Sequence, residues 1–291
     1  MKGVVARRLA KRLGVVILTV LGGGLICATM VRLAPGFDTD ERELDSRLSA
    51  DSQNQIRGER AGERNVKRFY VNFLANAMHG DLGESRTLNR PVLALLRERM
   101  PVTLRLVGIG LALAWAAGFS MAVTAAMARA TAYDWLVTLA VSVCLSLPAA
   151  VLALLVVYWE KPAYLALGLA VLPKLYSYSR NLLIDNYKRL HILAARAKGI
   201  GPLRILLWHV LPVGAPELVA LAGVSVSVAI GAAIPVEALC GIPGIGQLAW
   251  QAALGRDLPL LVTITVLVTL VTLIANAGAD FVDGSNHQEA Q

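Results

Sequence analysis

The stretch HILAARAKGIGPLRILLWHVLP, from His191 to Pro212, is a basic insert between apolar segments in the second half of the chain. It predicts a short helix with small side chains at Ala194, Ala195 and Ala197, then a Gly-Ile-Gly-Pro break and a second short helix that ends at Pro212. Two short helices around such a break can form a knob that projects from a membrane surface. Because small side chains let a partner's backbone approach closely, we expect this knob to dock a separate energy-supplying subunit.

The composition indicates a membrane protein. The chain has 291 residues, of which 16% are charged, and its mean hydropathy is +0.59. A soluble domain carries about 25% charged residues, and here the apolar residues come in long blocks. The net charge is +8, but the lysines and arginines lie between the apolar blocks, where membrane topology requires them. This placement argues against nucleic-acid binding.

Blocks of about 20 apolar residues predict an all-α membrane protein with six transmembrane helices. The first block, residues 13–31, follows the basic segment 1–12. It is longer than the apolar run of about 7–15 residues in a signal peptide, so we expect a retained first span. The other predicted spans cover approximately residues 103–128, 135–158, 163–182, 217–239 and 258–279.

The spans divide the chain into three parts. Residues 1–34 hold the basic N-terminal segment and the first span, residues 35–102 form a long extracytoplasmic loop region, and residues 103–291 form a five-helix transmembrane core. The basic insert, residues 184–215, lies between the fourth and fifth spans. Six spans with both termini in the cytoplasm place this insert in the cytoplasm, and the positive-inside rule independently favours the same side.

The outer loop region has two kinds of sequence. Residues 38–68 are highly charged, whereas residues 69–78 (FYVNFLANAM) are more apolar. The apolar run either lies along the membrane surface or forms a small folded cap over a pore mouth. Residues 91–99 predict an amphipathic helix with Pro91 in its first turn.

The sequence contains no motif for covalent chemistry. The GIPGIG run of residues 241–246 lacks the GK[ST] ending that binds phosphate and magnesium, and the common zinc-protease and serine-hydrolase motifs are missing. The four histidines are scattered and the three cysteines are far apart, so we predict no catalytic residue, cofactor or metal site. Uphill transport would then need an ATP site on another chain or an ion gradient.

Two ionisable residues inside the predicted spans are candidate pathway or gate residues. Lys174 either faces a hydrated pathway or extends its side chain toward the cytoplasmic headgroups. Glu237 follows Pro235 near the outer end of the fifth span, and we include both residues in the candidate gate. Glu237 either touches substrate at this gate or caps backbone amides of the glycine-rich run.

Several runs of residues carry a family resemblance when they are taken in their order along the chain. The run AARAKG at residues 194–199, followed by His209 and Pro212, is similar to the "EAA" loop that inserts into an ATPase. The other runs are RLAPG at 32–36, GDLGES at 80–85, RPV at 90–92, PVTL at 101–104, PVE at 235–237 and IPGIG at 242–246. Over nearly its whole length the chain resembles the permease subunit, with a long outer loop, of bacterial ABC importers of the dipeptide/oligopeptide class.

The sequence departs from the family pattern at three places in particular. The acidic residue of the "EAA" loop is absent, His191 stands where tyrosine is usual, and the connection between the third and fourth spans is only residues 159–162. Because this connection is short, the outer gate of this chain, and therefore its substrate, can differ from those of the family.

The resemblance implies an importer in the bacterial inner membrane for short peptides or similar small solutes. The implied ATPase-docking residues are Ala194, Ala195, Arg196, Ala197, Lys198 and Gly199. The implied partners are a second homologous permease subunit in a heterodimer, two ATPase subunits that hydrolyse ATP, an extracytoplasmic solute-binding protein and the lipid bilayer. Two alternatives stay open at this point: an ion-coupled secondary transporter that works alone, and a structural membrane subunit that does not transport.

Overall fold

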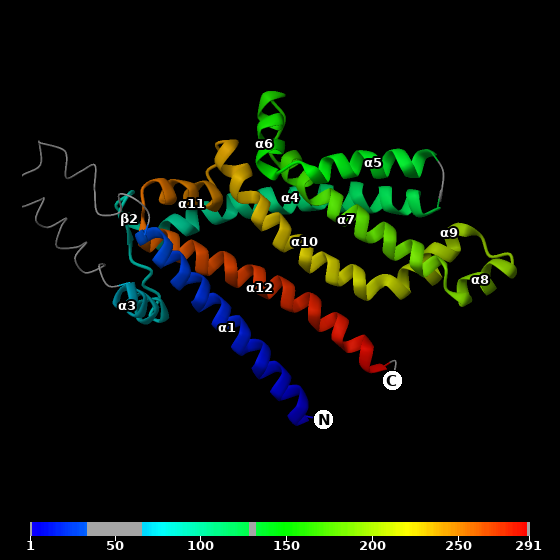
Figure 1. Cartoon of the computed structure of the whole chain (residues 1–291), viewed down its shortest axis with the longest axis horizontal. Coiled ribbons are helices and arrows are strands. Elements are labelled where there is room, and N and C mark those ends of the chain that lie inside the picture. The colour runs from blue at the N-terminus through cyan, green and yellow to red at the C-terminus, as the bar shows by residue number, and fades with distance from the viewer. Residues whose placement is uncertain (1, 34–65, 128–131, 290–291) are drawn as a thin grey trace, which may run out of the picture. The chain divides into compact units, whose positions relative to one another are not determined.

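The computed structural model describes residues 2–33, 66–127 and 132–289, and most of these residues are helical (Figure 1). The charged segment 38–65 and most of the RLAPG run lie outside the described residues. The helices are α1 (Lys2–Leu33), α3 (Val66–Met78), α4 (Val92–Met127), α5 (Ala132–Ser146), α6 (Ala149–Tyr158), α7 (Tyr164–Tyr187), α8 (Leu190–Ala197), α9 (Pro202–Ile205), a π-helix (Leu206–Val210), α10 (Leu211–Leu239), α11 (Ile245–Leu254) and α12 (Leu258–Glu289).

Within the described residues, four stretches of helix are long and apolar enough to cross a membrane, namely residues 14–33, 92–127, 202–239 and 258–277. A fifth is added if α5 and α6 together count as one broken span. The chain is therefore a helical membrane protein. Helix α7, which corresponds to the predicted fourth span, is not among these stretches; it is 24 residues long but carries Lys174 and a polar C-terminal half.

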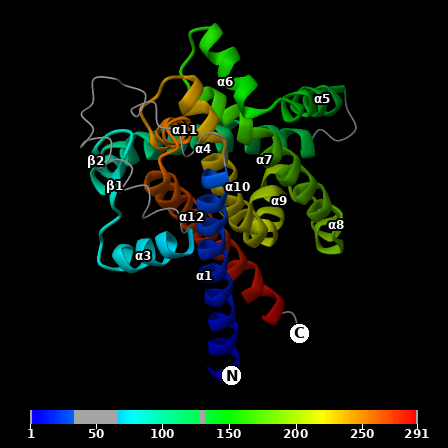
Figure 2. The ribbon, with the colours of Figure 1, turned by 60° about the vertical axis from the view of Figure 1, so that its left-hand side comes forward.

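The third apolar segment is broken, whereas the sequence predicted one continuous helix over residues 135–158. Helices α5 and α6 meet at an angle of 100°, and α6 points away from the direction of α5 (Figure 2). Pro148 is the N-cap residue of α6. It has no N–H to continue α5, and it disfavours a helical conformation at the preceding Leu147, so the chain turns at this point.

Two prolines lie inside or beside continuous helix: Pro101, which falls between the predicted helix 91–99 and the predicted second span, and Pro212, which was expected to end a helix. Pro101 lies within α4, so the predicted amphipathic helix and the second span are one helix. The prediction that the second helix of the basic insert stops at Pro212 is wrong, because the π-helix of residues 206–210 leads directly into α10. Pro212 occupies one of the first two positions of α10, where the hydrogen-bond pattern changes and a missing N–H is tolerated.

The described chain divides into two compact units. The first comprises residues 1–100 and 248–270, and the second comprises residues 101–247 and 271–291. In the first unit, the apolar run predicted over residues 69–78 forms α3, whose Tyr70 and Phe73 pack with Ala28 of α1 and Leu258 of α12. The Tyr70 hydroxyl donates a hydrogen bond to the Leu21 carbonyl oxygen, 2.7 Å away, so α3 is fixed to α1 by both apolar and polar contacts.

In the second unit, two apolar clusters hold the helices together. One cluster joins α4, α6, α7 and α10, and its buried residues include Leu152, Leu167 and Val236. The other joins α4, α5, α7, α8 and the segment that enters α10, and it includes Tyr176, Ile192 and Ile205. The basic insert is therefore packed onto the transmembrane helices rather than separate from them.

A short antiparallel ribbon in the first unit is tied to the start of α12. Strands β1 (Glu84–Ser85) and β2 (Arg90–Pro91) form the ribbon, and the fully buried Asp257 precedes α12. One Asp257 oxygen accepts the N–H of Leu260 at 3.2 Å, which caps the helix. The other accepts the Ser85 hydroxyl at 2.6 Å and the Thr87 N–H at 3.0 Å. Asp257 was not identified from the sequence.

We predict that Asp257→Ala lowers the stability of the purified chain by about 1–3 kcal/mol, because three donors lose their acceptor and one helix loses its cap. Asp257→Asn keeps one acceptor oxygen, so it should lower the stability less than Asp257→Ala does. Thermal unfolding in mild detergent measures the effect. Asp81→Ala is the matched control, since this exposed carboxylate accepts only the nearby Gly83 N–H among the bonds described. Equal losses for Asp257→Ala and Asp81→Ala would contradict the assignment.

Candidate functional site

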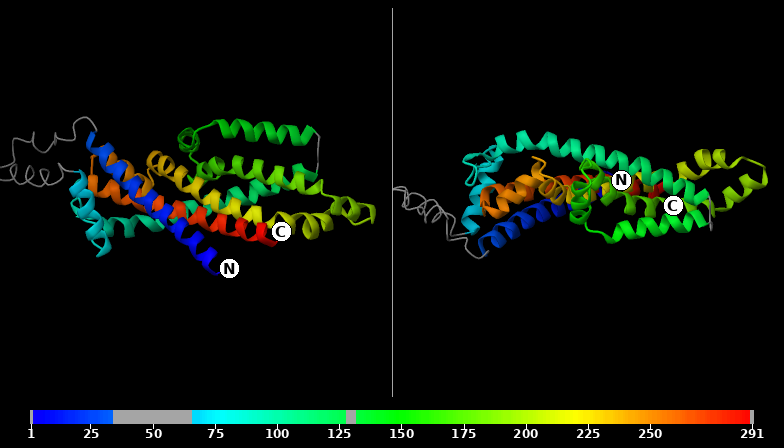
Figure 3. Two further views of the ribbon diagram at one scale, coloured as in Figure 1. Left: turned by 60° about the horizontal axis from the view of Figure 1, so that its bottom comes forward. Right: turned by 90° about the horizontal axis from the view of Figure 1, so that it is seen from above.

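The basic insert forms a compact loop at one end of the second unit. Helix α8 follows α7 after two residues, and residues 198–201 connect α8 to α9. Figures 1 and 3 show α8 and α9 at one end of the α7 and α10 pair, beyond the last turn of α7 and the first turn of α10. The loop is therefore a projecting feature with both of its ends anchored in long helices.

Gly199 ends α8 in a conformation that favours glycine. Its φ is +76°, and the N–H of the following Ile200 donates to the carbonyl of Ala195 at 3.2 Å. The N–H of Gly199 itself donates to the carbonyl of Arg196 at 2.9 Å. These two bonds form a Schellman motif, the usual glycine-dependent end of a helix. A Cβ atom at Gly199 would meet nothing within 4 Å, so the glycine is required by the backbone and not by crowding within the chain.

The inner side of α8 anchors the loop to the core. Ile192 is fully buried and Ala195 is 5% exposed, and both belong to the apolar cluster around Tyr187. The Arg196 guanidinium carbon lies 5.5 Å from the centre of the Tyr187 ring, which is a cation–π contact to the end of α7. The loop is thus held against α7 along one face.

The outer side of the loop presents five of the six predicted docking residues. Ala194, Arg196, Ala197, Lys198 and Gly199 are exposed, whereas Ala195 is buried. Three large apolar side chains that the sequence analysis did not single out are exposed beside them: Leu190 (83%), Leu193 (50%) and Leu203 (61%). Grouped exposed apolar side chains are common on surfaces that contact another protein or a membrane. The mixed apolar and polar pattern of residues 190–203 was the signal that could have identified them.

Glu237 is fully buried at the end of α10, where the glycine-rich run turns back. Its Oε2 accepts the N–H of Gly246 at 2.6 Å, in the first turn of α11. The N–H of the neighbouring Ile245 donates to the Thr103 hydroxyl at 2.8 Å. A carboxylate at a helix N-terminus is favourable because the unpaired N–H groups there are partly positive. This is the amide-capping arrangement that the sequence analysis gave as one of two roles. Pro235 lies partly buried inside α10.

Gly246 allows the glycine-rich run to pack directly on α10. A Cβ atom at Gly246 would come within 2.5 Å of the Ile234 Cα atom and 3.1 Å of the Ile234 carbonyl oxygen. These are backbone atoms, which cannot rotate away as a side chain can. The run therefore needs a residue without a Cβ at this position.

We predict that Gly246→Ala destabilises the chain by about 1–3 kcal/mol through overpacking. The measurement is the thermal unfolding midpoint of the chain in detergent. Gly108→Ala is the control, because Gly108 lies in α4 and a Cβ there would meet nothing within 4 Å. A midpoint for Gly246→Ala no lower than that for Gly108→Ala would contradict the close packing.

Lys174 lies in the middle of α7 and borders a cavity of about 290 Å³. The cavity lies at the break between α5 and α6, and its other lining residues include Cys144, Leu147, Ala149, Ala170, Val228 and Ala232. Lys174 is exposed and has no hydrogen-bond or ion-pair partner within the described part of the chain. The structure thus places Lys174 on α7 within the second unit, in a setting different from that of Glu237.

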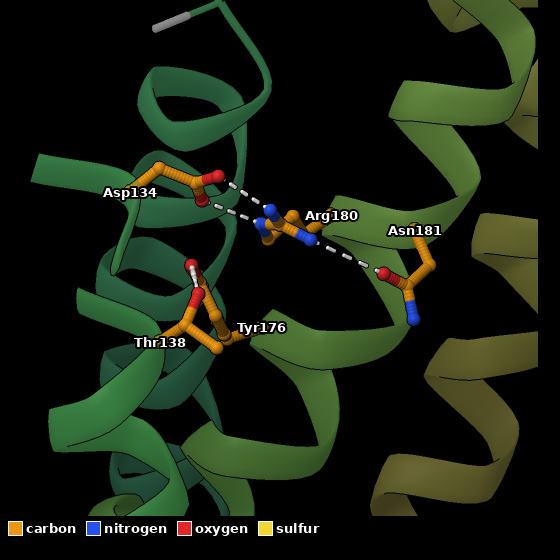
Figure 4. A network of polar contacts seen from close by, with 5 residues as sticks. All are labelled: Asp134, Thr138, Tyr176, Arg180 and Asn181. Atoms are coloured by element: carbon orange, nitrogen blue, oxygen red, sulfur yellow. Dashed lines mark hydrogen bonds and ion pairs between the residues drawn. The ribbon is translucent and has the colours of Figure 1, made fainter. Parts of the chain in front are cut away.

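A buried ion pair that the sequence analysis missed joins α5 to α7 (Figure 4). The Arg180 Nε donates to Asp134 Oδ1 at 2.7 Å, and its Nη2 donates to Oδ2 at 2.6 Å. Asp134 is 8% exposed, in the first turn of α5, and one turn farther on the Thr138 and Tyr176 hydroxyls are 3.1 Å apart. The planar guanidinium thus matches both carboxylate oxygens. In the sequence, the pair could have been suspected from Asp134, because a single acidic residue at the start of an apolar block needs a partner.

We predict that Asp134 and Arg180 are energetically coupled by about 1–3 kcal/mol, because each single change leaves a largely buried charge without its partner. Unfolding midpoints of Asp134→Ala, Arg180→Ala and the double variant give the coupling energy. The Arg90–Glu98 pair, with side chains 50% and 52% exposed, is the control and should couple by less than about 1 kcal/mol. Additive effects at Asp134 and Arg180 would contradict the prediction.

Comparison with known proteins agrees with the resemblance found in the sequence. Residues 99–287 match the family model described as "Binding-protein-dependent transport system inner membrane component". The oligopeptide transport system permease protein OppB of Escherichia coli K12 is 30% identical over 262 residues, which are 82% of this chain and 84% of that protein. A putative peptide transport system permease protein of Brucella suis is 28% identical over 241 residues, covering 70% of this chain and 77% of that protein. The chain therefore belongs to the inner membrane components of binding-protein-dependent transport systems, and it is a permease subunit of an ABC transporter.

Proposed function

We propose that this chain forms half of the translocation pathway of an importer for short peptides or similar small solutes. The proposal is supported by the names of its relatives, which are oligopeptide and peptide transport permeases. The other half of the pathway would be a second homologous permease subunit in a heterodimer. ATP hydrolysis would take place on two separate ATPase subunits, and an extracytoplasmic binding protein would deliver the solute.

The proposed topology has six spans with both termini in the cytoplasm. Its supports are the four long apolar helices, the broken pair α5–α6, and α7. Helix α7 has 24 residues and is therefore about 36 Å long, enough to cross a bilayer core of about 30 Å. Residues 35–102 would lie outside, residues 1–34 and 103–291 would hold the membrane-spanning helices, and the coupling loop 184–215 would lie in the cytoplasm.

The observation that carries the proposal is the exposed face of the loop formed by α8 and α9. Ala194, Ala197 and Gly199 leave room for a partner's backbone, and the exposed leucines supply apolar contact. We propose that this face inserts into a groove of one ATPase subunit. Ala195 would support the face from inside, together with Ile192, because both side chains pack in the core.

The mechanism follows from how the loop is attached. Only two residues separate α8 from α7, and α9 continues into the π-helix and α10. A displacement of the loop by the ATPase is therefore passed to two transmembrane helices at once. The chain performs no covalent step; ATP-dependent closure of the ATPases would favour one of two arrangements of the helices, and release would favour the other.

We predict that Gly199→Asp lowers recovery of the ATPase with the tagged transporter by about tenfold, equivalent to about 1.4 kcal/mol of docking free energy. The substitution strains a backbone at positive φ and places a charged group on the docking face. Gly199→Ala separates the two causes, since alanine is strained at positive φ but carries no charge.

Gly201→Ala is the matched control for that experiment. Gly201 has a φ of −62° and its Cβ position is open, so alanine there adds no strain. Both variants should reach the membrane in normal amounts. Wild-type recovery of the ATPase and normal uptake with Gly199→Asp would rule out docking at this loop.

A further inference from the structure

We infer that one face of α7 lines a water-filled part of the translocation pathway, and that Lys174 on this face binds an anionic group of the solute, such as a carboxylate. The inference rests on the proposed function and adds to it the residues and the charge of the recognised group. It is drawn from the second unit alone, where α7, the cavity and the break between α5 and α6 are all described.

The face is defined by four exposed polar residues: Lys174, Tyr178, Asn181 and Asp185. Their spacing of four, three and four residues places all of them on one side of a helix with 3.6 residues per turn. We call this the polar face of α7. Elsewhere on α7, residues such as Leu175 and Leu183 pack in the core, and Arg180 pairs with Asp134. Exposed leucines, Leu165 and Leu169, also lie away from the polar face.

The polar face of α7 is unsuited to contact with lipid. It carries a lysine, a phenol, an amide and a carboxylate, and charged groups in the bilayer core are costly unless they meet water or a partner. Asp185 has a partner in Lys188, with the two charged atoms 2.8 Å apart, but both belong to the last turn of the helix. Polar groups deeper in the membrane therefore require water or protein beside them.

If α7 crosses the bilayer as the proposed topology has it, Lys174 lies too far from both ends of the helix for its ammonium group to reach the headgroups easily. It lies ten residues after Tyr164 and thirteen before Tyr187, the two ends of α7. At 1.5 Å per residue these separations are about 15 Å and 20 Å, more than a lysine side chain spans. The geometry thus favours the hydrated pathway over the alternative in which Lys174 extends toward the membrane surface.

The cavity beside Lys174 suits an anionic group carried by a small, otherwise apolar solute. Among the residues that line the cavity, Lys174 is charged, and the others are mainly alanine, leucine and valine. Ala149, the first residue of α6, also lines the cavity, so the partly positive start of this helix lies at the same place. Broken spans whose half-helices begin beside an anionic substrate group are a known arrangement in transporters.

Water access to the face is tested by cysteine labelling of the whole transporter with its partner subunits in membrane vesicles. In a variant without the three native cysteines, Tyr178→Cys and Asn181→Cys should react at least tenfold faster with a membrane-impermeant methanethiosulfonate than Leu165→Cys and Leu169→Cys. All four positions are exposed on α7, but the two leucines lie away from the polar face. Thiols react as thiolates, which form in water.

The anion preference is tested with the native Cys144, which lines the cavity with Lys174. The measured quantity is the reaction rate of a negatively charged methanethiosulfonate divided by that of a positively charged one. We expect this ratio to be higher in a variant that keeps only Cys144 than in a variant whose single cysteine is Leu165→Cys. Lys174→Met should lower this ratio at least fivefold, because the field of the ammonium group is removed, and Lys174→Arg should preserve it. Lys161→Met, in the exposed turn before α7, is the control.

Transport supplies the third measurement, with a tripeptide as the free acid and as its C-terminal amide. Lys174→Met should reduce uptake of the free acid about tenfold and uptake of the amide less than twofold. Equal losses for both peptides, or reaction at positions 178 and 181 as slow as at 165 and 169, would overturn the inference. If the wild type takes up neither peptide, the proposed peptide function fails, and the two labelling experiments still decide whether the polar face of α7 is wet and attracts anions.

Discussion

The need to pair every backbone N–H and C=O group within the membrane governs how this chain is built. Apolar blocks satisfy that need as helices, and the chain can change direction only where local hydrogen bonds replace helical ones. Two changes of direction use the same device. At Gly199 and at Gly241, which have φ values of +76° and +66°, the N–H of the next residue returns to a carbonyl five residues back. Gly199 lies within the proposed docking loop, between α8 and α9, and Gly241 begins the glycine-rich run.

Three regions of the second unit differ in what lies around them. The glycine-rich run is closed: Glu237 is fully buried, Gly246 touches the α10 backbone, and the amide groups are paired. The α8–α9 loop and the polar face of α7 are open, with exposed leucines on one and exposed polar residues on the other. Buried groups such as the Glu237 carboxylate, which accepts the Gly246 N–H through Oε2, fix the helices, whereas open surfaces are left for the proposed partners and solute. This division is what a subunit that moves between two arrangements requires.

The sequence predicted the class of protein, the positions of most apolar helices and the position of the basic loop between α7 and α10, because these depend on local pattern. It did not predict the 100° break at Pro148, since the apolar pattern continues without interruption across it. The pairing of Asp134 with Arg180 joins residues 46 positions apart and so has no local signature. Ala195 was grouped with its neighbours as a docking residue, but it lies three residues after Ile192 and shares that residue's inward face. Asp257 was overlooked because a single acid beside a helix start has many possible roles.

The π-helix at residues 206–210 sets the rotational phase between the loop and the long span that follows it. Residues 202–239 form one continuous helical stretch of 38 residues, so the direction of every side chain on α10 depends on the number of residues before it. A π turn holds one residue more than an α turn, and one residue corresponds to a rotation of about 100°. Without the extra residue, the docking face and Glu237 would point in different relative directions. The count of residues between the two regions is thus constrained as tightly as their identity.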